Sequence, residues 1–531
     1  MRRPLIFIIC LIALAAGWSL WYVTPAGLGL TNDSAAYVGG ARSILAGTGY
    51  SDVWLDSSLE AITHYPPLLS LILSGLGLFG LDPYRGARVL NLFLLAANTG
   101  LLGILGWRLT KSELAGILLA LLFGLNGPIL KIHAYLLSEP LFIFFSLFSF
   151  LFFDLALVTT RSSRATRHLF LLTGFLAGLA CLTRYSGLAL LATFTLALFL
   201  FQPDWRSRFV TIAQFLGGAL PPLAIWFIRN KLVAGNATNR SFQFHPVTAD
   251  NLQPGLYNFS QFLLPVETWR RALVKSGALE WLLALLGLLL LIWLILTASK
   301  LFFKSQNHET AQAPNPLLFT TVLYSFAYFG AVLFSMSFFD ASTKFQHRIL
   351  SPLYVSWKML LAVVLNALTT KDTKSTKENL NNLLRALVYL LAIAILGLST
   401  FNFRQTVLEL RAAGQGYASW KWRDSLVMAD LKKLPAEVAI YTNTPPAVYL
   451  VIGRASRVIP TAMDPVDNRP RGDYQQNIDQ MRADLLAGRA VLALFDTSGM
   501  EDALGTNTVE NFTAGLTVLE KAQGDLLYGK P

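Results

Sequence analysis

Two acidic residues at the ends of apolar segments have the chemistry needed for proton transfer. Asp33 follows the first apolar segment of the chain, and Glu139 stands directly before Pro140 at the start of a later one. A carboxylate at the end of a membrane helix is costly unless it faces water or a charged partner, so both acids are candidate catalytic residues. Helix capping is the alternative, because Asp is a good N-cap and an acid stabilises the first turn of a helix.

Several cations occupy comparable places in the sequence. Arg184 is isolated between two apolar segments, whereas Lys344, His347 and Arg348 are crowded at the start of another. The spacing of four residues predicts that Lys344 and Arg348 share one face of a helix. A guanidinium suits phosphate, although a long cationic side chain can also extend to the membrane surface without binding a ligand. These cations indicate an anionic ligand.

The segment between these groups holds a further candidate. His64 and Tyr65 precede a Pro-Pro pair, which is typical of a rigid turn with the two rings at the membrane interface. Residues 34–46 predict an amphipathic helix in that interface, ended by Gly47. Together, the acids and cations could deprotonate an acceptor and bind a phosphate leaving group, or they could form the substrate gate of a transporter. The residue types alone leave both interpretations open.

The composition shows what kind of elements must position these residues. The 531 residues are 54% hydrophobic and only 14% charged, against roughly 25% charged in soluble domains, and the mean hydropathy is +0.50. About 20 apolar residues cross the hydrocarbon core of a membrane. The sequence therefore predicts an all-α polytopic membrane protein with about eleven transmembrane helices. They lie at residues 4–23, 87–107, 114–130, 140–158, 169–183, 187–201, 209–228, 280–299, 317–336, 349–368 and 384–401.

The distribution of Lys and Arg predicts the orientation. The net charge of +12 comes largely from short loops between apolar segments, which favours positive-inside topology and argues against a nucleic-acid partner. Every second loop is basic, including residues 159–168 and 369–383. We therefore expect a cytoplasmic amino terminus and a carboxyl terminus outside the cytoplasm. The two cysteines, Cys10 and Cys181, lie in apolar segments and predict neither a disulfide framework nor a thiolate metal site.

Two regions outside the spans stand out. Residues 24–86 and 229–279 form long outer loops, which are usually functional. From residue 402 charged residues become common, and alternating segments predict a helix at 404–433, strands at 438–441 and 490–495, and a helix at 445–453. We predict a transmembrane domain at 1–401 and a small extracytoplasmic α/β domain at 402–531. The latter contains no glycine-rich nucleotide-binding motif.

The order of these motifs resembles that of a known superfamily. An acid after the first helix is followed by an amphipathic helix, a Pro-Pro turn, Glu139-Pro140, a Leu-Thr-Arg ending at Arg184, and Arg348-x-Leu-x-Pro. Over residues 1–400 the chain resembles the GT-C glycosyltransferases, in particular bacterial members of the protein mannosyltransferase and aminoarabinose transferase type, which are similar to glycosyltransferase family 39.

This resemblance implies a multi-pass enzyme of the plasma membrane and cell envelope. Its donor would be a polyprenyl-phosphate sugar, and its acceptor a lipid, glycan or protein at the outer face. By motif, Asp33 is the expected base, Glu139 the second acid, and Arg184 and Arg348 the phosphate ligands. One base and one set of cations imply a single displacement with inversion. The resemblance leaves open whether a divalent metal takes part.

The chain departs from the pattern of the superfamily at two places. Asn32-Asp33 stands where members often have two acids, and Tyr65, preceded by His64, stands where they often have Lys. Both changes affect positions at which members of the superfamily are expected to bind a metal ion or the donor phosphate. Two other functions compete with the glycosyltransferase. The first is a transporter or flippase of lipid-linked sugars, which would show paired interrupted helices, and the second is a scaffold of envelope assembly.

Overall fold

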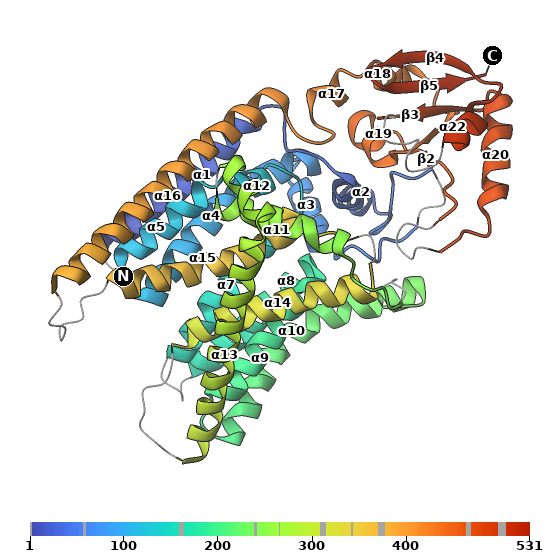
Figure 1. The fold of residues 1–531 in the computed structure, drawn as a ribbon. Coiled ribbons are helices and arrows are strands. Elements are labelled where there is room, and N and C mark those ends of the chain that lie inside the picture. Colours follow the sequence, from blue (N-terminus) through green and yellow to red (C-terminus); the bar gives the residue numbers. More distant parts are fainter. Residues whose placement is uncertain are drawn as a thin grey trace.

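The computed structural model describes residues 3–56, 60–158, 164–237, 242–264, 266–307, 315–340, 343–369, 378–463, 469–496 and 506–530. Long helices dominate the first part of the chain (Figure 1). They are α1 (Arg3–Val23), α2 (Asn32–Leu45), α3 (Leu68–Gly77), α4 (Pro83–Thr110), α5 (Glu113–Gly124), α6 (Gly127–His133), α7 (Glu139–Val158), α8 (Arg164–Thr183), α9 (Leu188–Phe201), α10 (Trp205–Ala234), α11 (Ala249–Leu263), α12 (Glu267–Lys275), α13 (Ala278–Asn307), α14 (Pro316–Phe338), α15 (His347–Thr369) and α16 (Glu378–Ala413).

Nine helices within the described residues are long and apolar enough to cross a membrane: α1, α4, α7, α8, α10, α13, α14, α15 and α16. The consecutive helices α5 and α6, bent by 60° at their junction, form a tenth candidate span. Helix α9 has 14 residues and is about 21 Å long, shorter than a hydrocarbon core of about 30 Å. Each predicted apolar segment thus lies on one helix or, at 114–130 and 187–201, on two consecutive ones, and the polytopic α-helical fold is confirmed.

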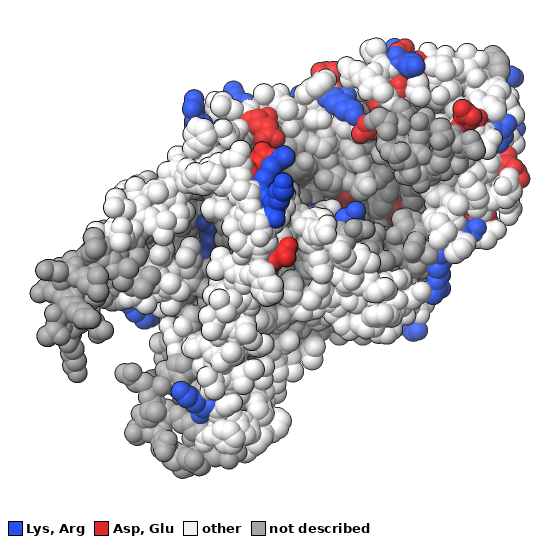
Figure 2. Space-filling model, in the orientation of Figure 1, with Lys and Arg blue, Asp and Glu red and all other residues white. Residues whose placement is uncertain are grey.

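The helices diverge in two groups from the level of α2 and α3 (Figure 1). Helices α1, α4, α5, α15 and α16 form one group, and α8, α9, α10, α13 and α14 form the other. On the face shown in Figure 2, charged side chains gather around the carboxyl-terminal end of the molecule, and the long helices carry few. The amino-terminal end of α1 lies at the opposite end of the bundle. Of the basic loops predicted at 159–168 and 369–383, residues 159–163 and 370–377 lie outside the described residues, and the rest belongs to the ends of α8, α15 and α16.

Helix α2 differs from the prediction of an amphipathic interfacial helix. Its residues from Ser34 to Ala41 are all buried, on every face of the helix. Helix α3 packs against it in the membrane part, and α19 (Pro445–Ile452) packs against it from the carboxyl-terminal region. The prediction was wrong because both faces of α2 are covered by protein, which the local pattern could not reveal.

Residues 414–530, which we call the carboxyl-terminal region, contain a five-stranded sheet. Its strand order is β2 (Arg457–Val458), β1 (Ala439–Thr442), β3 (Ala490–Leu494), β5 (Asp525–Gly529), β4 (Thr517–Ala522). Strand β1 is parallel to β2 and β3, and β5 is antiparallel to β3 and β4. The remaining helices are α17 (Trp420–Arg423), α18 (Leu426–Lys433), α20 (Tyr474–Leu486) and α22 (Thr506–Thr513).

The predicted strands at 438–441 and 490–495 are confirmed as β1 and β3, and the predicted helix at 445–453 as α19. The helix predicted at 404–433 is instead the end of α16 followed by α17 and α18, so the predicted boundary between residues 401 and 402 falls inside α16. A helix that leaves the membrane continues here into a more polar sequence without a break, and composition alone could not place its end.

Three distant segments meet at Gly29 and Leu30, just before α2. The Gly29 N–H donates to Ala134 O (2.7 Å), and its carbonyl accepts from Leu136 N–H (2.8 Å). On the other side, the Leu30 carbonyl accepts from Tyr417 N–H (2.9 Å). A Cβ on Gly29 would lie 2.6 Å from both the Tyr135 ring and Gln415, so only glycine fits there. This junction places the start of α2 beside the start of α7.

Candidate active site

Asp33 lies in the first turn of α2, but it does not cap that helix. Thr31 is the N-cap residue, and its own N–H donates to the Ser34 hydroxyl (2.9 Å). The carboxylate of Asp33 is engaged elsewhere: Oδ1 accepts from the Tyr65 hydroxyl (3.1 Å), and Oδ2 accepts from Arg348 Nη1 in an ion pair. The capping alternative for Asp33 is therefore wrong, because the helix begins two residues earlier than capping by Asp33 would require.

The electrostatics of this pair follow from its surroundings. Burial alone would raise the pKa of Asp33, but the charge and the hydrogen bond of Arg348 outweigh it, and the pKa lies below the usual 3.8. Burial, followed by the nearby Asp33 carboxylate, raises the pKa of Tyr65 well above 10. At neutral pH Asp33 is thus ionised and Tyr65 is a protonated hydrogen-bond donor.

A second acid–arginine pair lies next to the first. Arg184, between α8 and the short helix η1 (Tyr185–Gly187), donates from Nη1 to Glu139 Oε1 (2.7 Å) and to the Ser138 hydroxyl (3.1 Å). Glu139 begins α7, and its side chain is 1% exposed. Its other oxygen, Oε2, is buried without a hydrogen-bond partner among the described residues. Glu139 and Arg184, named separately as site candidates from the sequence, thus lie in direct contact.

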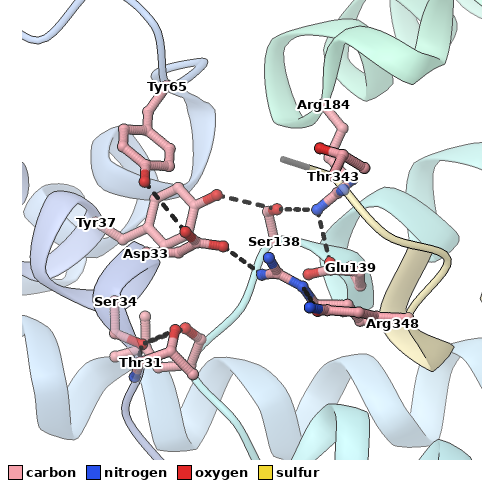
Figure 3. A network of polar contacts seen from close by, with 12 residues as sticks. Thr31, Asp33, Ser34, Tyr37, Tyr65, Ser138, Glu139, Arg184, Thr343 and Arg348 are labelled. Carbon is pink, nitrogen blue, oxygen red and sulfur yellow. Dashed lines mark hydrogen bonds and ion pairs between the residues drawn. The ribbon is translucent and has the colours of Figure 1, made fainter. Parts of the chain in front are cut away.

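Ser138 and Tyr37 link the two pairs (Figure 3). The Tyr37 hydroxyl donates to the Ser138 hydroxyl (3.1 Å), and the Tyr37 and Tyr65 rings meet edge to face with centroids 5.7 Å apart. Neither Tyr37 nor Ser138 was assigned to the site from sequence. Tyr37 lies four residues after Asp33, the spacing that puts two helical side chains on one face.

Tyr65 reaches Asp33 because the end of α10 holds the preceding loop. Arg229 donates to the carbonyls of Ile62 (2.6 Å) and Tyr50 (2.9 Å), and the fully buried Asn230 donates to the Thr63 carbonyl (3.1 Å). Sequence reasoning missed both positioning residues. One indication was available in the sequence: Arg229 is a cation directly after the long apolar segment 209–228.

The other predicted substrate-binding residues lie at the edge of this network. His64 is exposed and packs on the Tyr65 ring (centroids 4.4 Å apart). His347 lies 3.2 Å from Asn258 Oδ1 through Nδ1. Lys344 precedes α15, which begins at His347. The predicted shared helical face of Lys344 and Arg348 is therefore wrong, since Lys344 is not in the helix.

The carboxyl-terminal region also reaches the site. The hydroxyl of Tyr417 donates to the Asn32 side chain, next to Asp33 in the sequence. The Tyr417 ring packs edge to face against Trp422 (centroids 4.9 Å apart), which in turn packs against Phe495 at the end of β3. A contact therefore runs from the core of the sheet to the residue preceding Asp33, and no local sequence pattern indicated it.

The described residues contain no group of three or more His, Cys, Asp or Glu side chains that could hold a metal ion. Asp33 and Glu139 each face an arginine, and Asn32 replaces the second acid of the superfamily pattern with a neutral amide. The functional groups present are two carboxylates, two guanidiniums and three hydroxyls, a set that can transfer protons and bind an oxyanion.

Known proteins resemble this chain in sequence and in structure. Residues 57–233 match the family model of dolichyl-phosphate-mannose-protein mannosyltransferase. No curated protein sequence matches the chain. The structure of ArnT from Cupriavidus metallidurans in the apo state superimposes with a TM-score of 0.57 at 15% identity, covering 98% of this chain and 97% of that one. ArnT from the same organism bound to undecaprenyl phosphate gives a TM-score of 0.56 at 14% identity, with the same coverage.

A more distant neighbour is the apo oligosaccharyltransferase of Archaeoglobus fulgidus, with a TM-score of 0.55 at 13% identity over 94% of this chain and 70% of that one. All these neighbours are GT-C glycosyltransferases. The chain has the GT-C fold. The expected resemblance is thereby confirmed at the level of the fold. The segment matched by the family model contains Tyr65, Glu139 and Arg184 but neither Asp33 nor Arg348.

Proposed function

We propose that this protein is a membrane glycosyltransferase that transfers a sugar from a polyprenyl-phosphate donor to an acceptor at the outer face of the membrane. The observation that carries the proposal is the network of two acids and two arginines at the start of α2, α7 and α15. The GT-C fold supports it, and so does the neighbour ArnT, whose structure is known with undecaprenyl phosphate bound.

In the proposed reaction Arg348 and Arg184 hold the donor phosphate, and Asp33 is the general base. The acceptor atom attacks the anomeric carbon as its proton passes to the Asp33 carboxylate. The bond between that carbon and the phosphate oxygen breaks, and polyprenyl phosphate leaves with its charge held by the guanidiniums. The attacking and leaving groups lie on opposite sides of the carbon, so a single displacement inverts its configuration.

Glu139 has a different proposed role in this reaction. Its carboxylate is buried against Arg184 and is the less accessible of the two acids. It fixes the orientation of that guanidinium, while its second oxygen is available to a hydroxyl of the donor sugar. His64, Tyr65, Lys344 and His347 remain proposed substrate-binding residues at the rim, Tyr65 through its hydrogen bond to Asp33.

The decisive experiment incubates the purified protein with a panel of polyprenyl-phosphate sugars and measures released polyprenyl phosphate. Release by the wild-type protein and its loss in Asp33→Asn would support the proposal. Parallel reactions with and without EDTA decide whether a divalent metal takes part. Movement of a lipid-linked sugar across proteoliposomes without any release would favour the transporter or flippase. The described residues contain one bent helix pair rather than the related pairs expected of such a transporter.

We also propose that the amino terminus is cytoplasmic, that the carboxyl-terminal region lies outside the cytoplasm and that the membrane is the plasma membrane. The basic loops support this orientation. Single cysteines at Arg167 and at Gln476, introduced after replacement of Cys10 and Cys181, test it with an impermeant reagent in intact cells. We expect labelling at position 476 alone, and labelling at position 167 alone would reverse the topology.

A further inference from the structure

In this structure both arginines of the site already bind carboxylates. Arg184 binds Glu139, and Arg348 binds Asp33 and also donates through Nε to Gln346 Oε1 (3.0 Å). The two acids therefore balance the charges of the two guanidiniums. A donor phosphate adds a negative charge that needs a guanidinium, so its binding must alter at least one of these pairs.

The two pairs differ in how readily a carboxylate can be displaced. The Glu139 side chain is 1% exposed, and moving its charge away from Arg184 would leave a buried ion without compensation. Asp33 and Arg348 are 22% and 30% exposed. Water can therefore solvate the Asp33 carboxylate once its partner is taken, and the Tyr65 hydroxyl stays as a second partner on Oδ1.

We propose that Asp33 occupies the phosphate position on Arg348 in the ligand-free enzyme, and that the donor phosphate displaces it and thereby creates the active base. This inference rests on the proposed function and adds the order of events: the donor binds first, and only then can the acceptor be deprotonated. Displacement frees Oδ2, the oxygen that faces Arg348, while Tyr65 keeps Oδ1 in place.

The charge balance explains why the order matters. A carboxylate held by a guanidinium is a weak base, because protonating it would cost the ion pair. After displacement the site holds two guanidiniums and three anions, and the freed Asp33 carboxylate is the anion without a cation. It then accepts the acceptor proton on Oδ2 as the sugar is transferred. An acceptor that arrives without the donor meets a carboxylate that is already engaged.

The test compares the affinity of undecaprenyl phosphate for purified wild-type protein, Asp33→Asn and Asp82→Asn. Removal of the competing carboxylate should make Asp33→Asn bind about 3- to 10-fold more tightly, although its turnover is strongly reduced. Asp82 is the matched control. It is also an outer acid paired with an arginine, Arg42 (2.9 Å), and it caps α4, a task that asparagine performs equally well. Its replacement should leave the affinity unchanged.

The outcomes separate the two proposals. If the wild-type protein does not bind undecaprenyl phosphate, the proposed function is wrong. If it does, and Asp33→Asn binds equally or less tightly, or if Asp82→Asn tightens binding to the same extent, the displacement is wrong and the function stands. If Asp33→Asn does not fold, product inhibition of the wild-type enzyme serves as the test instead. Undecaprenyl phosphate must compete with the donor and not with the acceptor, and competition with both would contradict a donor-first order.

Discussion

The two ion pairs of the site contrast with a third ion pair, between α4 and α7. Arg108 of α4 and Asp154 of α7 form a pair whose side chains are 15% and 9% exposed. Asp33 with Arg348 and Glu139 with Arg184 use the same two functional groups, but three hydroxyls surround them, and one carboxylate oxygen has no partner among the described residues. The Arg108–Asp154 pair joins two helices, whereas the pairs of the site have further polar groups beside them.

A second internal charge supports the same distinction. Lys358, buried in α15, donates from Nζ to the Leu122 carbonyl (3.0 Å) near the end of α5. The bend between α5 and α6 frees that carbonyl, because the N–H of Asn126 donates to Phe123 instead. Lys358 thus satisfies the broken end of a helix in the membrane. Lys358 and the Arg108–Asp154 pair thus each connect two helices of the bundle.

The largest effect should come from Asp33→Asn. Loss of a general base typically lowers the rate about 10²- to 10⁴-fold, whereas stability should change little, because Thr31 and not Asp33 caps α2. Turnover of the best donor, measured beside the melting temperature, checks this. Wild-type turnover in Asp33→Asn would mean that another residue is the base, with Glu139 the next to replace.

Arg108→Met should lower the stability of the protein without changing its affinity for the ligand. Removing one partner of a buried pair leaves Asp154 uncompensated and costs about 3–5 kcal/mol of stability. The double variant Arg108→Met/Asp154→Leu should recover most of that loss. Undecaprenyl phosphate affinity of the folded fraction should equal that of the wild type in both. A specific loss of affinity would show that the Arg108–Asp154 pair is not purely structural.

Arg184→Ala should weaken undecaprenyl phosphate binding about 10- to 150-fold, because each hydrogen bond to a charged group contributes roughly 1.5–3 kcal/mol. The same change leaves the buried Glu139 carboxylate without its cationic partner. The variant Arg184→Ala/Glu139→Gln, in which no charge is stranded, should fold better and still bind weakly. Wild-type affinity in the folded double variant would remove Arg184 from the phosphate site.

The smallest effect concerns pH and stability. The pKa of Asp33 is lower in the folded protein than its ordinary value, so its ion pair stabilises the fold above about pH 3.9, and this contribution is lost as pH falls through the folded pKa. The pair is partly exposed, so we expect less than about 1 kcal/mol. The melting temperature of the wild type minus that of Asp33→Asn should be constant above pH 5 and shrink below pH 4. A difference that grows on acidification would contradict the assigned direction.

Local sequence determined most of the elements. A run of about 20 apolar residues can satisfy its backbone in a membrane only as a helix, so the long spans followed from hydropathy. Strands β1 and β3 followed from short β-branched and apolar runs, which the sheet buries. The hairpin of β4 and β5 was missed, although Gln523 and Gly524 both have the positive φ of a tight turn.

The site residues could also be selected from the sequence, because an acid or arginine at the end of an apolar segment needs a partner. The sequence alone predicted that Asp33, Glu139, Arg184 and Arg348 lie on one side of a membrane and act together. Which carboxylate binds which arginine was decided only by the tertiary structure. Asp33 and Arg348 are 315 residues apart, and no local energy term connects them. Their contact exists because α2 is held between the membrane helices and the carboxyl-terminal region, and that packing also determines which pair is buried and which is open to a ligand.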